Sequence, residues 1–184
     1  RFALGGYRVA MLARDKDRLT TLETTIKGTR GYICDVSNLD QLVETADRVA
    51  AEMGPPSVVI HNAVSGNLDG GGASKFLESD PTRLERNFRV NTTSLLYLAR
   101  ATAPAMIKEG EGAIIVTGNT SSLRGKANFA YFAPTKAAQR ILAEAMARDL
   151  GPKGVHVAYL LIDASILTPR TLCLFATGRP DEFF

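Results

Sequence analysis

Ala113–Thr117 reads AIIVT, a continuous apolar run that predicts a β-strand covered on both faces. Two runs of the same kind occur at Ser57–Asn62 (SVVIHN) and at Val155–Ile162 (VHVAYLLI). Nearer the N-terminus, Tyr7–Ala13 (YRVAMLA) and Gly31–Val36 (GYICDV) predict two more strands. These runs do not alternate apolar with polar residues, and that pattern is typical of a parallel sheet buried between helices.

Amphipathic stretches separate the predicted strands. The predicted helices are Asp15–Lys27, a helix from Asn38 to about Met53, one from Asp80-Pro81 to near Gly110, and one from about Asn128 to Leu150. Arg1–Leu4 is expected to be the last turn of a further helix, which Gly5-Gly6 would stop. This alternation predicts one α/β domain over residues 1–184, built on a doubly wound parallel sheet.

Composition and charge narrow the class of protein. The 184 residues are 45% hydrophobic and 22% charged, the balance of a soluble globular protein. The net charge of +3 is scattered and forms no basic stripe, so no nucleic-acid partner is expected. No apolar run nears the roughly 20 residues that span a bilayer, and no secretory signal is visible, so we expect a cytoplasmic protein without a membrane partner. Cys34 and Cys173 allow one disulfide, but two reduced thiols are expected, and no metal site is predicted.

Seven collinear segments resemble a known family. In order they are ALGGYRVAMLARDKDRL, CDV, HNAV, RVNTTS, GAIIVTGNTSSLRG, FAPTK and KGVHV. Their order and spacing are similar to those of the short-chain dehydrogenases/reductases, over nearly the whole chain. The resemblance implies a Rossmann-like fold and an NAD(P)-dependent oxidoreductase that transfers hydride between a nicotinamide cofactor and a carbonyl or alcohol substrate. It also places the family's first strand and glycine-rich turn before Arg1, so we expect a domain truncated at both ends.

The resemblance assigns cofactor contacts to the carboxyl ends of the predicted strands. Arg14 follows the position at which NAD-dependent members carry an acidic residue, and a guanidinium there favours the 2′-phosphate of NADP, with NAD as the second choice. The other assigned contacts are Asp35, Val36, Asn62, Ala63, Lys136 and Asp163. Three of these assigned contacts also have a plainer structural explanation. Arg14 suits the start of a solvated helix, Asp35 suits the end of a strand, and Asp163 suits the start of a turn. Val64 replaces a family glycine and narrows the space at the ribose.

The catalytic positions show two substitutions. Active members use Asn, Ser, Tyr and Lys, with Tyr and Lys four residues apart on one helix face. Lys136 matches the lysine, but Phe132 stands at the tyrosine position and has no exchangeable proton. Tyr131 lies five residues before Lys136 and is expected to point away from it. Asn91 matches the family's structural asparagine, and its plainer alternative is to satisfy backbone groups inside its helix. Asn119 stands at the serine position, close to hydroxyl side chains at residues 117, 120, 121 and 122.

Two hypotheses of function follow. The first is an active oxidoreductase whose proton comes from a water on Lys136 or from Tyr131, because losing a positioned acid costs only about 10²–10⁴-fold in rate. The second is a catalytically impaired cofactor-binding protein that acts as a sensor or as the inert partner in an oligomer. Arg14 and Asp35 argue against a third, a structural subunit that binds no nucleotide. His61 is expected to be a buried, hydrogen-bonded histidine and not a base.

The resemblance also implies a homodimer or homotetramer in which the two long predicted helices pair across a two-fold axis. Their apolar residues equally suit packing against their own sheet. The glycine-rich segment at 66–72 and the segment from Leu167 to Phe184 are expected to border the substrate pocket.

Overall fold

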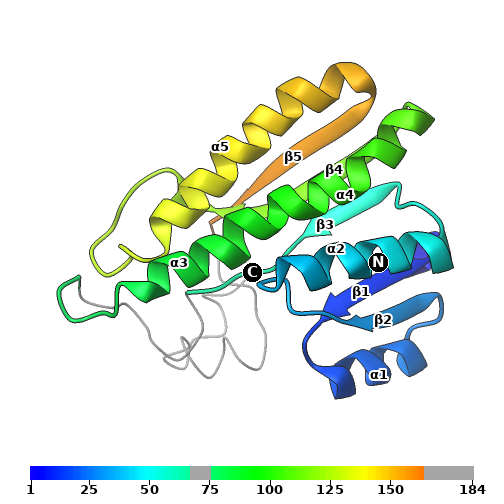
Figure 1. The fold of residues 1–184 in the computed structure, drawn as a ribbon, viewed down its shortest axis with the longest axis horizontal. Helices are drawn as coiled ribbons and strands as arrows, with labels where there is room; N and C mark the ends of the chain where they lie inside the picture. The colour runs from blue at the N-terminus through cyan, green and yellow to red at the C-terminus, as the bar shows by residue number, and fades with distance from the viewer. Residues whose placement is uncertain (67–75, 164–184) are drawn as a thin grey trace.

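Figure 1 shows the fold, a computed structural model that describes residues 1–66 and 76–163. Its strands are β1 (Val9–Ala13), β2 (Thr29–Ile33), β3 (Val58–His61), β4 (Gly112–Asn119) and β5 (Val155–Ile162). Its helices are α1 (Lys16–Thr25), α2 (Leu39–Met53), α3 (Thr82–Phe88), α4 (Ser94–Glu109) and α5 (Ala133–Leu150). All strand pairs in these residues are parallel, which confirms the predicted Rossmann-like α/β class.

Helices lie on both faces of the strands, and β2 shows this most directly because successive residues of a strand point to opposite faces. A Cβ built on Gly31 would lie 2.9 Å from Leu19 of α1, so this face of β2 meets α1. The next residue, Tyr32, is 1% exposed and donates a hydrogen bond of 2.9 Å to Glu52 of α2. The β1–β2 pair is therefore covered by helices on both faces.

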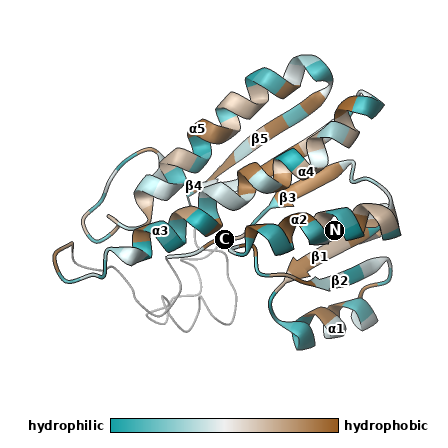
Figure 2. Cartoon of the chain, viewed as in Figure 1, coloured by the Kyte–Doolittle hydropathy of each residue, from teal (hydrophilic) through white to brown (hydrophobic). Residues whose placement is uncertain are grey.

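The main core lies between β3–β5 and the helices α4 and α5, and its fully buried side chains are Leu95, Met106, Ile114, Val116 and Val155. Figure 2 shows hydrophobic residues running along β1 and β3. The other face of β3 is less covered than predicted, since Ile60 is 43% exposed. The reason is that α1 packs on β1 and β2 and does not extend over β3.

A slot separates β1 from β3. Among the described residues no backbone ladder joins these two strands, so β1–β2 and β3–β4–β5 form separate sheets. The slot has a volume of about 310 Å³, and its apolar lining comes from both strands and from α2 and α4: Ala10, Leu12, Leu42, Ala46, Val59, Ile60 and Leu98. The general doubly wound strand order is 3-2-1-4-5-6, with strands numbered along the chain of such a fold. In that order strand 1 lies between strands 2 and 4, at a place equivalent to this slot. Contacts between α2 and α4 hold the two halves together.

Several boundaries differ from the predictions. The strand predicted at 31–36 is β2, which lies two residues earlier and ends at Ile33. The helix predicted from Asn128 begins five residues later as α5, because Asn128 adopts a left-handed φ of 69°. Pro134 lies in the first turn of α5, where its missing N–H removes no helical hydrogen bond.

The helix predicted from Asp80 to Gly110 is in fact three consecutive pieces. α3 and α4 are joined by a π-helical turn at Arg89–Thr93, which inserts an extra residue into the helical path. At the N-terminus, the expected last helical turn is a 3₁₀ turn at Ala3–Gly5, and it ends at Gly6 with a left-handed φ of 89°. Across residues 1–66 and 76–163, no helix has both the length and the apolar character needed to cross a membrane.

Candidate functional site

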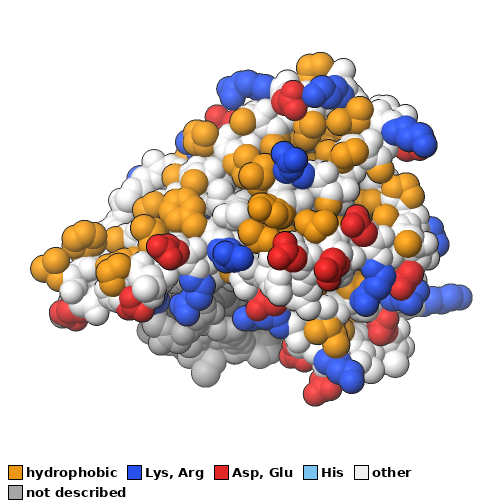
Figure 3. All heavy atoms as spheres, viewed as in Figure 1, with side chains coloured by type: hydrophobic (Ala, Val, Ile, Leu, Met, Phe, Trp, Pro, Cys, Tyr) orange, Lys and Arg blue, Asp and Glu red, His pale blue; other side chains and the backbone are white. Residues whose placement is uncertain are grey.

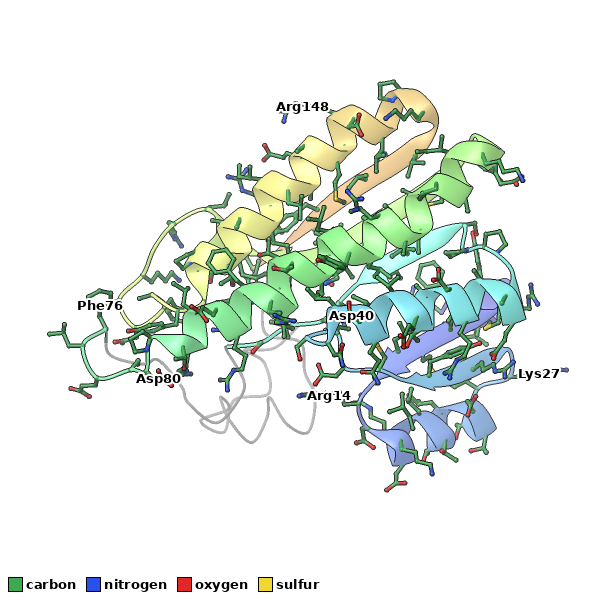
Figure 4. All side chains as sticks on the ribbon, in the orientation of Figure 1. Arg14, Lys27, Asp40, Phe76, Asp80 and Arg148 are labelled. Atoms are coloured by element: carbon green, nitrogen blue, oxygen red, sulfur yellow. The ribbon has the colours of Figure 1, made fainter. Side chains whose placement is uncertain are left out.

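A cavity at the carboxyl ends of β1, β2 and β3 brings four predicted cofactor contacts together. Arg14, Asp35, Val36 and Ala63 all line it, and its volume is about 500 Å³. Arg14 extends from the turn after β1, as labelled in Figure 4. Ligands of open α/β sheets bind at this edge because loops from neighbouring strands converge there. Asn62 lines the slot between β1 and β3 instead of this cavity.

Asp35 presents a charged oxygen to this cavity. Its Oδ1 accepts hydrogen bonds from the backbone N–H of Ser37 at 2.9 Å and from the Ser37 hydroxyl at 2.7 Å. Burial would raise the pKa of Asp35, but these hydrogen bonds and the charge of Arg14 outweigh it and hold the pKa below its ordinary value. The carboxylate is thus ionised at neutral pH, and within the described chain only one of its oxygens accepts a hydrogen bond.

Lys136 lies in the first turn of α5 with its ammonium buried. The residue is 2% exposed, and its Nζ donates to the carbonyl of Thr117 at 2.9 Å and to Oε1 of Gln139. Burial lowers the pKa of Lys136 from 10.5 to about 8. One helical turn earlier, Phe132 is 3% exposed and its ring lies 6.4 Å from that of Phe129. Position 132 therefore carries a buried ring that cannot supply a proton.

Tyr131 turns away from Lys136, as expected, although it lies two residues before α5 begins and the helical step of about 100° per residue therefore does not apply to it. Its hydroxyl lies 2.8 Å from the carbonyl of Phe76 and 3.3 Å from that of Ser79. Its ring also stacks on Phe76, with centroids 6.5 Å apart and an interplanar angle of 25°. The phenol is thus bound to the segment before α3 and not to Lys136.

Asn91 makes hydrogen bonds to segments outside its own helix. It is 0% exposed within the π-helical turn, and its Oδ1 accepts from the backbone N–H of Ser65 at 2.8 Å. Its Nδ2 donates to the carbonyl of Ser65 at 3.0 Å and to Oγ1 of Thr135 at 2.8 Å. Asn91 therefore joins the loop after β3, where Ser65 lines the cavity, to the first turn of α5.

Asn119 and Asp163 lie at the carboxyl ends of β4 and β5. The Oδ1 of Asn119 accepts from the backbone N–H of Ser121 at 3.2 Å and so caps a 3₁₀ turn. Oδ1 of Asp163 accepts from the hydroxyl of Thr120 at 2.7 Å. Asn62 belongs to the same edge, since its Oδ1 accepts from Thr117 at 2.7 Å. These three positions share the sheet edge expected for a nicotinamide and its substrate.

Sequence reasoning missed several residues of the site, among them Ser65. Arg86 and Val90 line the cavity from α3 and the π-helical turn, and their spacing of four residues is a signal that places both on one helix face. Gln139 is 0% exposed and follows Lys136 by three residues, again on one helix face. His61 is 3% exposed and hydrogen-bonded, as predicted. Burial and the charge of Lys136 lower its pKa from 6.5 to about 4. Cys173, most of the segment at 66–72 and the segment from Leu167 to Phe184 lie outside the described residues.

Comparison with known proteins agrees with this geometry. The family described as short chain dehydrogenase matches residues 1–166. The chain belongs to this family. The 7alpha-hydroxysteroid dehydrogenase of Escherichia coli K12 is 29% identical over 144 residues, which cover 74% of this chain and 54% of that enzyme. Human L-xylulose reductase is 27% identical over 153 residues, which cover 83% of this chain and 59% of that enzyme. The chain thus spans little more than half the length of these curated relatives.

Solved short-chain dehydrogenase structures share the fold. A metagenomic short-chain oxidoreductase in complex with NADP superposes with a TM-score of 0.77 at 26% identity, covering 96% of this chain and 82% of that one. Family members of this kind are oxidoreductases that use NAD or NADP. That Phe132 and Asn119 replace a tyrosine and a serine rests on motif position and stays a prediction.

Proposed function

We propose that this chain is the cofactor-binding core of an NADP-dependent oxidoreductase that exchanges hydride between nicotinamide and a carbonyl or alcohol substrate. One observation carries the proposal: a short-chain dehydrogenase presents a single cavity lined by Arg14, Asp35, Val36 and Ala63 at the carboxyl ends of its strands. The NADP named in the complex of the metagenomic relative supports the choice of cofactor.

The chemistry of the cavity fits NADP. Arg14 has no hydrogen-bond or ion-pair partner among the described residues, so its guanidinium is available for a 2′-phosphate. The second oxygen of Asp35 suits an exocyclic amine, and Val36 and Val90 suit the faces of an aromatic base. Val64, 47% exposed on the same wall, takes space that the family leaves to a glycine. Bound NADP would supply or accept the hydride.

Lys136 and Asn91 would position the reacting groups. The ammonium of Lys136 has three N–H groups, and two of them bind Thr117 and Gln139. The third is left for a ribose hydroxyl or a water. Because the pKa of Lys136 is about 8, its ammonium holds the proton at neutral pH and can pass it to a water beside the substrate oxygen. Asn91 holds the loop and α5 in register around that point.

A second candidate is a cofactor-binding protein without turnover. The observation that favours it is the pair of aromatic residues before Lys136: Phe132 is buried and Tyr131 donates its hydroxyl elsewhere. Within the described residues, neither of these two side chains brings a phenol hydroxyl to Lys136. Such a protein would report the cofactor's redox state, or would complete an oligomer as its inert partner.

The full-length protein decides between these functions. NADPH and NADH are titrated first, and a panel of carbonyls is then screened with wild type, Phe132→Tyr and the matched control Phe129→Tyr. We expect NADPH to bind more tightly than NADH, because only NADPH offers a phosphate to Arg14. We also expect Phe132→Tyr to gain about 10²–10⁴-fold in turnover over wild type, while Phe129→Tyr gains none.

Three outcomes contradict parts of the proposal. Turnover that appears only in Phe132→Tyr rejects the active-enzyme function and leaves the cofactor-binding one. Tighter binding of NADH rejects the role given to Arg14. Failure of the full-length protein to bind either cofactor rejects both functions.

We also propose that the protein self-associates in the cytoplasm through α4 and α5. Figure 3 shows hydrophobic side chains gathered over these two helices. Their exposed members are Leu96, Tyr97, Ile107 and Ile141, which are 36% to 53% exposed. Isologous pairing across a two-fold axis would cover this face. Light scattering of wild type and Ile141→Glu tests it, since a wild-type monomer contradicts the proposal.

A further inference from the structure

The ammonium of Lys136 belongs to a chain of buried polar side chains that the catalytic positions do not account for. Its one side-chain partner in the described residues is Gln139, whose Oε1 accepts from Nζ. The amide nitrogen of Gln139 donates in turn to the carbonyl of Asn91 at 2.5 Å. Lys136, Gln139 and Asn91 are each at most 2% exposed. Water therefore does not replace these partners.

The chain continues through His61 on β3. The amide nitrogen of Gln139 lies 3.2 Å from Nδ1 of His61, and Nε2 of His61 lies 2.8 Å from the hydroxyl oxygen of Ser94. The hydroxyl of Ser94 donates to the carbonyl of Val90 at 2.6 Å. His61 and Ser94 are 3% and 0% exposed. The chain thus crosses from α5 over β3 to the π-helical turn and α4.

The ammonium fixes the direction of every hydrogen bond in this chain. An ammonium only donates, so Oε1 of Gln139 must face it and the amide nitrogen must face His61. Nδ1 of His61 then accepts, and Nε2 carries the proton that it donates to Ser94. This arrangement requires a neutral imidazole. Burial and the nearby charge of Lys136 keep His61 neutral at neutral pH.

We infer that Gln139 and His61 are positioning residues of Lys136: Gln139 supplies the acceptor that fixes the inner side of the ammonium, and His61 locks the orientation of the Gln139 amide. With Thr117 taking a second N–H, a single N–H remains for a ligand. That a nicotinamide ribose binds this remaining N–H of Lys136 rests on the proposed function. Phe132 cannot hold the Lys136 ammonium as a tyrosine hydroxyl would. The series of hydrogen bonds through Gln139 and His61 holds the ammonium in place instead.

The geometry also excludes a purely generic packing role. A glutamine placed only to fill space leaves its polar atoms unpaired, and each buried unpaired group costs about 1–3 kcal/mol. Here, both ends of the Gln139 amide are satisfied by groups from three different elements. The titratable groups packed around Lys136 are His61 from β3 and Tyr159 from β5, whose hydroxyl lies 3.3 Å from the carbonyl of Lys136. No carboxylate therefore competes with Gln139 for the ammonium among the described residues.

The test measures the pKa of the Lys136 ammonium by NMR of ¹⁵N-lysine-labelled full-length protein without cofactor, with Lys136→Met assigning the resonance. Gln139→Leu removes the acceptor and should lower this pKa by about one pH unit. Gln139→Glu keeps an acceptor and adds charge, so it should raise the pKa. The control is Thr102→Val, which removes a buried hydroxyl from α4 that, within the described residues, binds only the carbonyl of Leu98. It should leave the pKa unchanged.

A second readout is the dissociation constant of NADPH. Gln139→Leu should weaken binding by about tenfold at neutral pH, and Gln139→Glu should restore most of it. An unchanged Lys136 pKa in both Gln139 variants overturns the inference, and so does an unchanged NADPH affinity in Gln139→Leu. If wild type binds no NADPH, the proposed function falls while the NMR result still decides the inference. If Gln139→Leu does not fold, the isosteric Gln139→Glu decides it.

Discussion

Replacing Lys136 with methionine should change the pH dependence of stability in a way that follows directly from its burial. Burial lowers the pKa of Lys136 from 10.5 to about 8, so the folded protein binds this proton less tightly than the unfolded chain. Below about pH 8 the lysine is charged in both states, and the folded state carries the full cost of burying it. Above pH 10.5 it is neutral in both, and that cost vanishes.

The magnitude follows from the same pair of pKa values. At 1.36 kcal/mol per pH unit, the interval from about 8 to 10.5 corresponds to about 3 kcal/mol. The hydrogen bonds to Thr117 and Gln139 favour the charged form, so about 3 kcal/mol is an upper limit. The free energy of unfolding of wild type should therefore rise relative to Lys136→Met as the pH increases from 8 to 10.5.

Urea unfolding at half-unit steps from pH 7 to 10.5 measures this difference. Lys136→Met leaves the Thr117 carbonyl and Oε1 of Gln139 without their donor, which adds an offset that does not depend on pH. The ionisation of other residues cancels when the two curves are subtracted. A difference that stays flat from pH 8 to 10.5 would refute the reasoning, because it would mean that Lys136 titrates normally in the folded protein.

Three further predictions concern the cofactor, the loop and one glycine. Arg14→Ala should weaken NADPH binding by about 10- to 100-fold, as expected for the loss of one charge-assisted hydrogen bond, and should leave NADH binding unchanged. Calorimetric titration with both cofactors checks this prediction. Equal losses of affinity for NADPH and NADH would contradict it. Asn91→Ala should lower the free energy of unfolding by about 2–4 kcal/mol, because it removes the two hydrogen bonds that the buried Asn91 side chain makes to the backbone of Ser65, and a loss under 1 kcal/mol in urea would contradict that. Gly154→Ala should cost more than about 3 kcal/mol, since its φ is +86° and a Cβ would lie 2.1 Å from the carbonyl oxygen of Gly110. The matched Gly110→Ala, which has a φ of +74° and open space around its Cβ, should cost only about 1 kcal/mol, and equal costs would refute the role of the clash.

Much of the fold was predictable from local pattern. The apolar runs at β3, β4 and β5 place all three strands correctly, because continuous apolar runs are typical of the strands of parallel sheets. Element ends were less predictable. Asn128 adopts a left-handed conformation that few residues visit, and this delayed the start of α5.

The parts of the site that sequence missed depend on contacts between distant segments. Gln139 and His61 are 78 residues apart, and neither their residue types nor their spacing predicts that they meet. Asn91 was recognised, but its partner Ser65 was not, because the π-helical turn redirects its side chain out of the helix. Arg86 was missed since a charged residue on a helix is usually a solvated one.

The unpaired edges of β1 and β3 also affect how the molecule unfolds. Without a backbone ladder between them, the β1–β2 half is joined to the rest mainly by the side-chain contacts of α2 with α4. Hydrogen exchange should therefore resolve two cooperative units, with β1 and β2 opening at a lower free energy than β4 and β5. The candidate cofactor cavity draws Arg14 from one unit and Val90 from the other. A ligand that contacts both units would stabilise them together, so that they open in one cooperative step. The degree to which the two units exchange together would therefore measure how much of the protein has bound cofactor.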